Sequence, residues 1–358
     1  MPGTGRRALN RSKPLCISTS LHLLVPGLLG PLSADAREWE ALRRPLPALQ
    51  LLLARASRQV IPARSADQLI ADQFSIVADV PELPAGALGL LGEGGEPAEA
   101  FWFKADPVHL RPDRDRLMLF PAAASASSPS EAETFVRECN RLLAQDGMEL
   151  RIGERGGWYL RLPAPAVLET TPTDEVVGRY IDAYLPRGPE ARRWMSLLTE
   201  LQMVLHASSA NLEREARGLP AVNGLWIWGG GRRPAQVHGD WTLTRGDRSL
   251  LRGLAREAGV AHESLPPARE WKPGGRELML LPAQQEALAD GDLQAWYEAA
   301  LSLERDWLVP LLEKLRSGEI GRIVVETGRL RLTLTGRELR RFWRRPRPLL
   351  KDLEFQSE

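Results

Sequence analysis

A run of glycines followed by two arginines is the feature of this sequence best suited to chemistry. Residues 223–234 read Asn-Gly-Leu-Trp-Ile-Trp-Gly-Gly-Gly-Arg-Arg-Pro, and the apolar first half is typical of a buried strand. A turn made by Gly229, Gly230 and Gly231 brings backbone N–H groups close to an anion, and Arg232 adds charge-assisted hydrogen bonds. The alternative is a tight turn whose arginines face water. The run fits neither a Walker P-loop nor a dinucleotide-binding loop.

Polar residues ahead of the glycine run form a second group of candidate ligands. His206 and Asn211 close a helical segment, and Arg214 follows them. Together with Asn223 and Arg232 they predict an anion site, and a phosphorylated small molecule is the ligand expected there. A solvated helix end explains the same residues equally well.

Metal-ligand spacing occurs twice in the sequence and is incomplete both times. Asp106 and His109 lie three residues apart, and His238 and Asp240 lie two apart, on one face of a strand. One imidazole and one carboxylate do not complete a zinc or transition-metal site. A surface turn and an ordinary strand explain the two pairs without any ligand. No cofactor is therefore expected; Mn or Zn is the alternative if the protein is an enzyme.

Arginines surround two aromatic residues near the C-terminus. Residues 337–351 contain seven basic residues, together with Phe342 and Trp343. Such interleaving is found in nucleic-acid-binding segments, but no nucleic-acid fold signature accompanies it. We therefore expect a docked helix with an exposed basic face, and a protein partner is the alternative use of this segment.

Composition limits the classes of protein that this chain can belong to. Its 358 residues include 43% hydrophobic residues and carry a formal net charge of +1, which permits a large core and gives no overall attraction to nucleic acid or membrane. Only Cys16 and Cys139 are present, so reduced thiols in the cytoplasm are expected. No apolar stretch is long enough for a transmembrane helix.

Alternating strands and helices predict an α/β fold with three layers and a mostly parallel sheet. Residues 1–18 read as a disordered leader, and residues 19–97 and 166–346 as a discontinuous core. Residues 98–165 read as an inserted α+β module, and residues 347–358 as a tail. Within these parts, residues 86–97 and 106–113 are expected to be loops, residues 122–129 a polar linker, and Ser130 a helix cap.

The residues between 197 and 234 resemble a segment of archaeal-type cofactor-independent phosphoglycerate mutases, which belong to the alkaline-phosphatase-like superfamily. The segment carries His206, Asn211, Arg214, Gly218-Leu219-Pro220-Ala221-Val222-Asn223, Leu225-Trp226-Ile227-Trp228-Gly229-Gly230-Gly231 and Pro234. With Leu23-Leu24-Val25-Pro26-Gly27-Leu28-Leu29-Gly30 and Ala105-Asp106-Pro107-Val108-His109-Leu110, the whole chain looks closest to bacterial RpfE-type regulatory proteins. The resemblance covers about residues 20–345 and implies an alkaline-phosphatase-like core.

Departures from the mutase pattern decide the expected function. Where the mutases place a metal-binding Asp-Gly after the first strand, this sequence has Pro26-Gly27. The stretches matching their later Asp and His ligands contain no histidine, and no histidine follows His262. A two-metal site cannot stabilise a transferring phosphoryl group without such ligands. The sequence therefore predicts a pseudoenzyme with a regulatory or phospho-ligand-sensing role; a mutase or phosphatase with a rebuilt site is the alternative.

Overall fold

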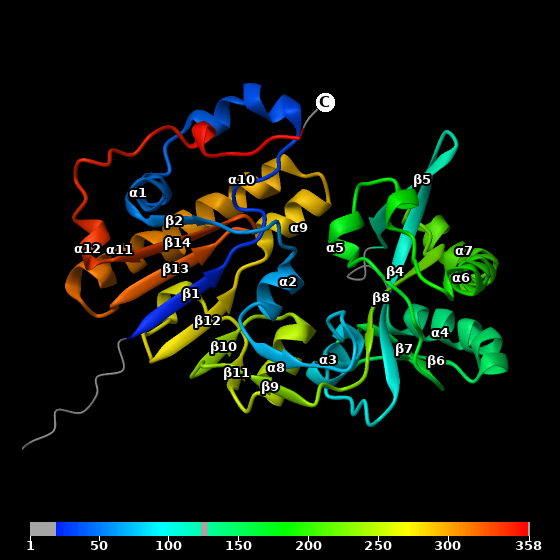
Figure 1. Cartoon of the computed structure of the whole chain (residues 1–358). Helices are drawn as coiled ribbons and strands as arrows, with labels where there is room; N and C mark the ends of the chain where they lie inside the picture. The colour runs from blue at the N-terminus through cyan, green and yellow to red at the C-terminus, as the bar shows by residue number, and fades with distance from the viewer. Residues whose placement is uncertain (1–18, 123–127, 357–358) are drawn as a thin grey trace, which may run out of the picture.

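The computed structural model describes residues 19–122 and 128–356. The predicted leader at 1–18 with Cys16, most of the linker at 122–129 and the last two residues of the tail lie outside the described residues. Figure 1 shows two lobes: a core lobe built on the large sheet around β1 (Ser20–Leu24), and a second lobe built on β4 (Phe101–Asp113). Within the described residues, no helix is both long and apolar enough to cross a bilayer.

The core lobe contains a seven-stranded sheet in the order β11-β10-β12-β1-β13-β14-β2. Its other strands are β11 (Ala261–Glu263), β10 (Leu243–Arg245), β12 (Arg276–Leu280), β13 (Arg322–Glu326), β14 (Leu330–Thr335) and β2 (Ser57–Val60). The first five strands in this order run parallel, and β14 is antiparallel to both of its neighbours. The mostly parallel sheet confirms the predicted fold class.

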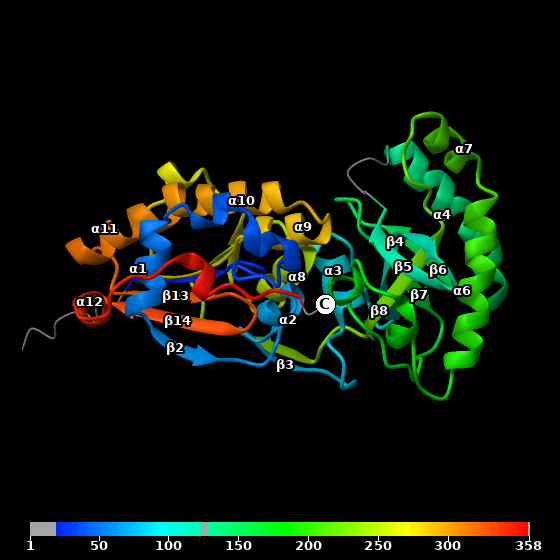
Figure 2. The same ribbon diagram turned by 90° about the horizontal axis from the view of Figure 1, so that it is seen from above.

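Helices cover both faces of this sheet and complete the three layers (Figure 2). One face packs against α1 (Pro47–Arg55), α10 (Leu293–Ser302) and α11 (Val309–Ser317), and the other against α2 (Ala66–Ala71) and α8 (Ser249–Glu257). The chain also contains α9 (Ala283–Ala289) and α12 (Gly336–Leu339). Because side chains alternate along a strand, Leu23 faces the first layer of helices and Leu24 the second.

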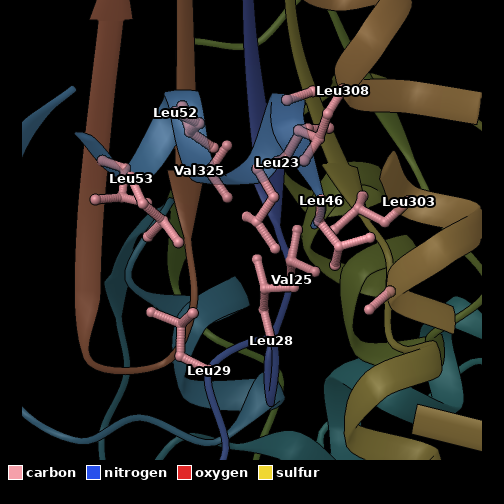
Figure 3. Packing of buried hydrophobic residues seen from close by; sticks show 14 of the residues in the cluster. Leu23, Val25, Leu28, Leu29, Leu46, Leu52, Leu53, Leu303, Leu308 and Val325 are labelled. Carbon is pink, nitrogen blue, oxygen red and sulfur yellow. The ribbon is translucent and has the colours of Figure 1, made fainter. Parts of the chain in front are cut away.

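The largest hydrophobic cluster lies between β1, β13 and the first layer of helices. Figure 3 shows Leu23 and Val25 packed with Leu52, Leu308 and Val325. All five side chains are nearly inaccessible to water, and burying a side chain of this size stabilises the folded state by about 2 kcal/mol. This cluster holds β1 in place between β12 and β13. It thereby also sets the position of the carboxyl edge of the parallel sheet.

The second lobe is an antiparallel sheet covered by helices. Its strands are β4, β5 (Arg116–Pro121), β6 (Glu149–Ile152), β7 (Trp158–Leu162) and β8 (Gly224–Gly231), and its helices are α4 (Pro129–Leu143), α5 (Thr173–Val176), α6 (Ala191–His206) and α7 (Ser209–Ala216). The chain passes to and from it beside the short pair β3 (Ser75–Val77) and β9 (Gln236–His238). Because β8 pairs with β4 and α6 packs in the same hydrophobic cluster, the lobe is larger than the predicted module at 98–165.

Three local predictions were wrong. Residues 106–113 continue β4 and are not a loop, because they pair with both β5 and β8. Ser128, not Ser130, caps α4 and shares a capping box with Glu131. Most of the predicted loop at 86–97 is the buried helix α3 (Ala85–Gly92), which packs against α8.

Glycines allow α3 and α8 to pack backbone against backbone. A Cβ atom on Gly92 would lie 1.9 Å from the Ser249 carbonyl oxygen, and one on Gly253 would lie 1.9 Å from the Leu88 carbonyl oxygen. Glycine lowers helix propensity, so the local sequence indicates a loop. The close approach between helices makes the same residues favourable in the folded chain.

Candidate functional site

A cleft between the two lobes is the best candidate for a functional site. It encloses about 620 Å³ and is lined by residues from α2, α3, β4, α5, β8, α8 and α9. In Figure 1, α2 and α3 lie between the large sheet and β4, and α5 lies at the edge of the second lobe that faces the core lobe. Arg248 comes three residues after β10, and Gln285 lies on the helix that follows β12. The cleft therefore opens beyond the carboxyl ends of parallel strands, where open α/β sheets bind ligands.

Arg248 lies at the centre of the first charge cluster in the cleft. Its Nη1 is 3.1 Å from Oδ2 of Asp67, and its Nη2 is 2.8 Å from Oδ2 of Asp174. Burial raises the pKa of Asp67 to about 6, with Arg248 opposing that rise. Although burial acts the other way, the carboxylates of Asp174 and Asp67 hold the pKa of Arg248 above its ordinary value. The guanidinium thus stays charged and joins α2 to α5.

Lys104 and Asp106, next-but-one neighbours on β4, form the second charge cluster. The Lys104 Nζ lies 3.0 Å from Oδ1 of Asp106, and it also lies over the Tyr159 ring, 4.7 Å from the centroid. Oδ2 of Asp106 accepts hydrogen bonds from Trp228 Nε1, at 2.7 Å, and from the Thr173 hydroxyl. Burial opposes ionisation, but Lys104 and these hydrogen bonds hold the pKa of Asp106 below its ordinary value. Asp106 is therefore a fully satisfied carboxylate.

Carboxylates outnumber cations in the cleft. Its charged lining consists of Asp67, Asp106, Asp174, Glu286, Asp290, Lys104 and Arg248. Burial raises the pKa of Glu286 as well. An entering ligand thus meets an acidic environment in which both cations already have partners on this chain.

The cleft does not fit the two-metal centre that the mutase resemblance implies. Among the described residues, no group of three or more His, Cys, Asp or Glu side chains is placed to hold a metal ion. Asp67 and Asp174 share Arg248, and Asp106 pairs with Lys104. A divalent ion needs carboxylate oxygens that are free to coordinate it, and it is repelled by positive charge nearby. In the cleft, the side chains of Lys104 and Arg248 occupy these carboxylates and supply such positive charge.

The predicted glycine turn is wrong. Gly229, Gly230 and Gly231 lie inside β8, and all three are buried. The Gly229 N–H donates to the Thr170 hydroxyl at 3.0 Å. A Cβ on Gly230 would come within 2.3 Å of the Phe103 ring, so the glycines allow close packing within the second lobe. Arg232 directly follows β8 and is partly buried. Because the glycines before it are part of the strand, they form no turn with which Arg232 could bind an anion.

Three further predicted ligands act in the structure as supports for the backbone. Asn211 donates to the Leu205 and Val222 carbonyls and accepts from the Val222 N–H. Asn223 makes the same kind of paired bonds with the backbone of Leu110. The side chain of Arg214 is fully buried, donates to the Pro220 carbonyl and lies 3.4 Å from Glu131.

The histidine candidates do not come together. His206 is exposed at the end of α6, and His109 bonds to the Ala221 carbonyl. His238 and Asp240 do form a pair, 3.2 Å apart, but both are largely exposed near β9. Asp106 and His109 lie three residues apart on β4, so their side chains point to opposite faces. Of the four metal candidates, only Asp106 lines the cleft.

Sequence reasoning missed the residues that build the cleft. Asp67, Lys104, Asp174 and Arg248 come from four separate segments and form no local motif. The available signal was positional: Arg248 follows a strand and begins a helix, as residues at the carboxyl edge of a parallel sheet do.

Comparison with known structures agrees with the fold class described above. The chain superposes on the structure of PH0037 protein from Pyrococcus horikoshii with a TM-score of 0.50 and 13% identity, covering 89% of this chain and 87% of that one. A cofactor-independent phosphoglycerate mutase from Thermoplasma acidophilum matches with a TM-score of 0.41 and 15% identity, over 89% and 90% of the two chains. The match to PH0037 protein therefore extends over most of the mixed α/β fold with its mostly parallel sheet.

Curated sequence relatives are 2,3-bisphosphoglycerate-independent phosphoglycerate mutases. The enzyme from Methanosarcina mazei is 31% identical over 100 residues, which cover 26% of this chain and 25% of that enzyme. A probable mutase from Geobacter sulfurreducens is 26% identical over 165 residues, 44% of this chain and 41% of the relative. These matches span less than half of the relatives' length. No protein-family model matches the chain.

Proposed function

We propose that this chain is a non-catalytic, phosphoglycerate mutase-like protein whose cleft has a regulatory, ligand-binding role. The single observation that supports the proposal best is the position of the Arg248 guanidinium between Asp67 and Asp174. A carboxylate that is held by an internal cation is not available to a divalent metal. A mutase of this type uses two divalent ions to stabilise the negative charge on the transferring phosphoryl group. Without them, the cleft offers no free positive charge for this purpose.

The charge of the cleft also bears on which ligand binds there. Five carboxylates against two paired cations favour a neutral or cationic polar ligand over the phosphorylated small molecule that the sequence indicates. Trp228 also lines the cleft and donates to Asp106 there. In our proposal, therefore, the ligand is a polar molecule without a phosphate group.

Metal analysis combined with a mutase assay tests the proposal. The purified full chain is titrated with Mn²⁺ and Zn²⁺, its bound metal is quantified, and conversion of 3-phosphoglycerate is followed beside the Methanosarcina mazei enzyme. We expect no stoichiometric metal and no turnover above the blank. Stoichiometric Mn or Zn together with turnover would identify a working enzyme and overturn the proposal.

The ligand preference is tested separately by thermal denaturation. Inorganic phosphate and 3-phosphoglycerate should leave the Tm unchanged at pH 8, because carboxylates outnumber cations in the cleft lining. The double variant D174N/E286Q removes two negative charges from the cleft lining and serves as the comparison. If the carboxylates repel phosphate, any Tm increase caused by phosphate should be larger in the double variant than in the wild type. An equal Tm increase in both proteins would show that the cleft carboxylates do not disfavour phosphate.

A further inference from the structure

Residues 340–348, which we call the basic–aromatic segment, form an exposed surface far from the cleft. The segment follows α12, which lies in Figures 1 and 2 at the end of the core lobe opposite the second lobe. The docked helix expected over residues 337–351 is wrong, because Gly336–Leu339 is a short α-helix, residues 342–348 are irregular and exposed, and Leu349–Lys351 is a single 3₁₀ turn. Pro346 and Pro348 disfavour a helix over residues 342–348, because a proline inside a helix lacks the N–H and clashes with the preceding turn.

Two aromatic side chains at the centre of this segment point into solvent. Phe342 is 77% exposed and Trp343 is 66% exposed. Their rings meet edge to face, with centroids 5.3 Å apart and planes at 83°. Each ring can bury on the order of 200 Å² in an interface, so leaving both in water is unfavourable unless a partner covers them.

Arginine side chains of the segment nevertheless bond it to the core lobe. Arg341 donates to the Arg55 carbonyl at 3.1 Å and to the Ser57 hydroxyl at 3.2 Å, and Arg344 donates to the Ala56 carbonyl at 3.4 Å. In return, Arg55 donates to the Leu339 carbonyl at 2.6 Å. A segment that is already ordered loses less conformational entropy when a partner binds.

The charge around the aromatic pair is almost entirely positive. Residues 337–351 contain seven basic residues and one acidic residue, Glu338, which pairs with Arg341. Arg347 pairs with Asp352. Arg340, Arg344 and Arg345 border the aromatic pair, and no described ion pair involves them. Trp and Arg are also the residues that contribute most to protein interfaces.

We propose that the basic–aromatic segment binds an acidic segment of another protein, one that carries apolar side chains among its carboxylates. The carboxylates pair with the arginines, and the apolar side chains cover Phe342 and Trp343. Single-stranded nucleic acid fits less well, because rings packed edge to face cannot both offer open faces to successive bases. A membrane surface fits less well, because two aromatic rings give only marginal anchoring.

Binding of designed peptides to the full chain tests this inference. The probe is a fluorescein-labelled peptide of repeated Glu-Glu-Leu, with Gln-Gln-Leu and Glu-Glu-Ser repeats as comparisons, and fluorescence anisotropy reports binding. We expect the Glu-Glu-Leu peptide to bind roughly tenfold more tightly than either comparison. Both F342S/W343S and R344Q/R345Q should weaken its binding by about the same factor, and added salt should weaken it further.

Matched variants separate this surface from general charge and apolar effects. R192Q/R193Q removes two exposed arginines from α6, and M203S/L212S removes two exposed apolar side chains from α6 and α7; neither should change binding. The inference is wrong if these controls weaken binding as much as the segment variants do. It is also wrong if an oligothymidine or a vesicle of phosphatidylserine binds the segment more tightly than the Glu-Glu-Leu peptide.

Discussion

Asp67 carries the clearest pH dependence in this molecule, because it is buried beside a cation that does not fully compensate for lost hydration. Its pKa rises from 3.8 to about 6 on folding. Between these values the folded chain holds a proton that the unfolded chain has released. Stability from this group is complete below pH 3.8 and is lost as the pH rises through about 6.

We therefore expect D67N to change how stability depends on pH. The difference in free energy of unfolding between wild type and D67N should fall by about 2 kcal/mol from pH 4 to pH 7. Urea unfolding at several pH values measures it. The other carboxylates contribute to the pH dependence of both proteins, many of them in the opposite direction. Their contributions cancel when the free energy of unfolding of D67N is subtracted from that of the wild type. A constant difference across this range would show that Asp67 titrates normally.

Individual polar residues were harder to interpret from sequence than the strands that carry them. Arg214 and Asn211 have the types expected of ligands, yet they bond to the chain itself. The Arg214 partner Glu131 lies 83 positions away in sequence. The sequence shows that a residue can donate hydrogen bonds, but the acceptor is fixed by the tertiary fold.

Among the elements, the contact between α3 and α8 tolerates the least change. We expect G253A to lower the free energy of unfolding by about 3 kcal/mol or to prevent folding, because its Cβ would overlap the Leu88 carbonyl. Urea denaturation measures the effect. G336A is the control, because nothing lies within 4 Å of the added atom. Equal stability of the two variants would mean that α3 can move away from α8.

Strands were predictable where their pattern was local. Apolar and polar residues alternate at 330–335, which is β14, and the apolar run at 21–25 includes most of β1. The helix α3 was not predictable from propensity, because Gly86, Gly89 and Gly92 favour a loop. Their spacing of three residues places them near one another on the surface of a helix. This spacing is the feature of the sequence that indicates a closely packed helix here.

At the scale of the whole molecule, contacts from α5 hold the two lobes together across the cleft. Asp174 pairs with Arg248, and Gln68 donates to Glu175 at 2.9 Å. The hydrophobic side of α5, through Val176, packs with the second lobe. The short helix therefore belongs to one lobe and bonds to the other.

Breaking these bonds should loosen the cleft without unfolding either lobe. In D174A/E175A we expect amide hydrogen exchange to accelerate by roughly tenfold in peptides that cover α5 and α2. D182A, an exposed carboxylate on the 3₁₀-helix Ile181–Tyr184, serves as the control. Unchanged exchange in D174A/E175A would show that apolar contacts alone join the lobes.

The extent of the second lobe could not be read from the sequence. The strand β8 begins more than a hundred residues after β4, yet the two pair along most of their length. Local patterns end the module at residue 165, because residues 166–190 contain few regular elements. Long-range pairing of this kind is fixed by packing between surfaces, which periodicity does not reveal.

The position of Arg248 also has an evolutionary consequence. Replacing Arg248 alone would leave the buried Asp67 and the partly buried Asp174 without this partner, and replacing both carboxylates first would leave a partly buried guanidinium. Either intermediate is less stable than the intact cluster, because a charge that is largely removed from water loses its partner. The three residues should thus be inherited together, because a change at any one of them removes a partner from the others.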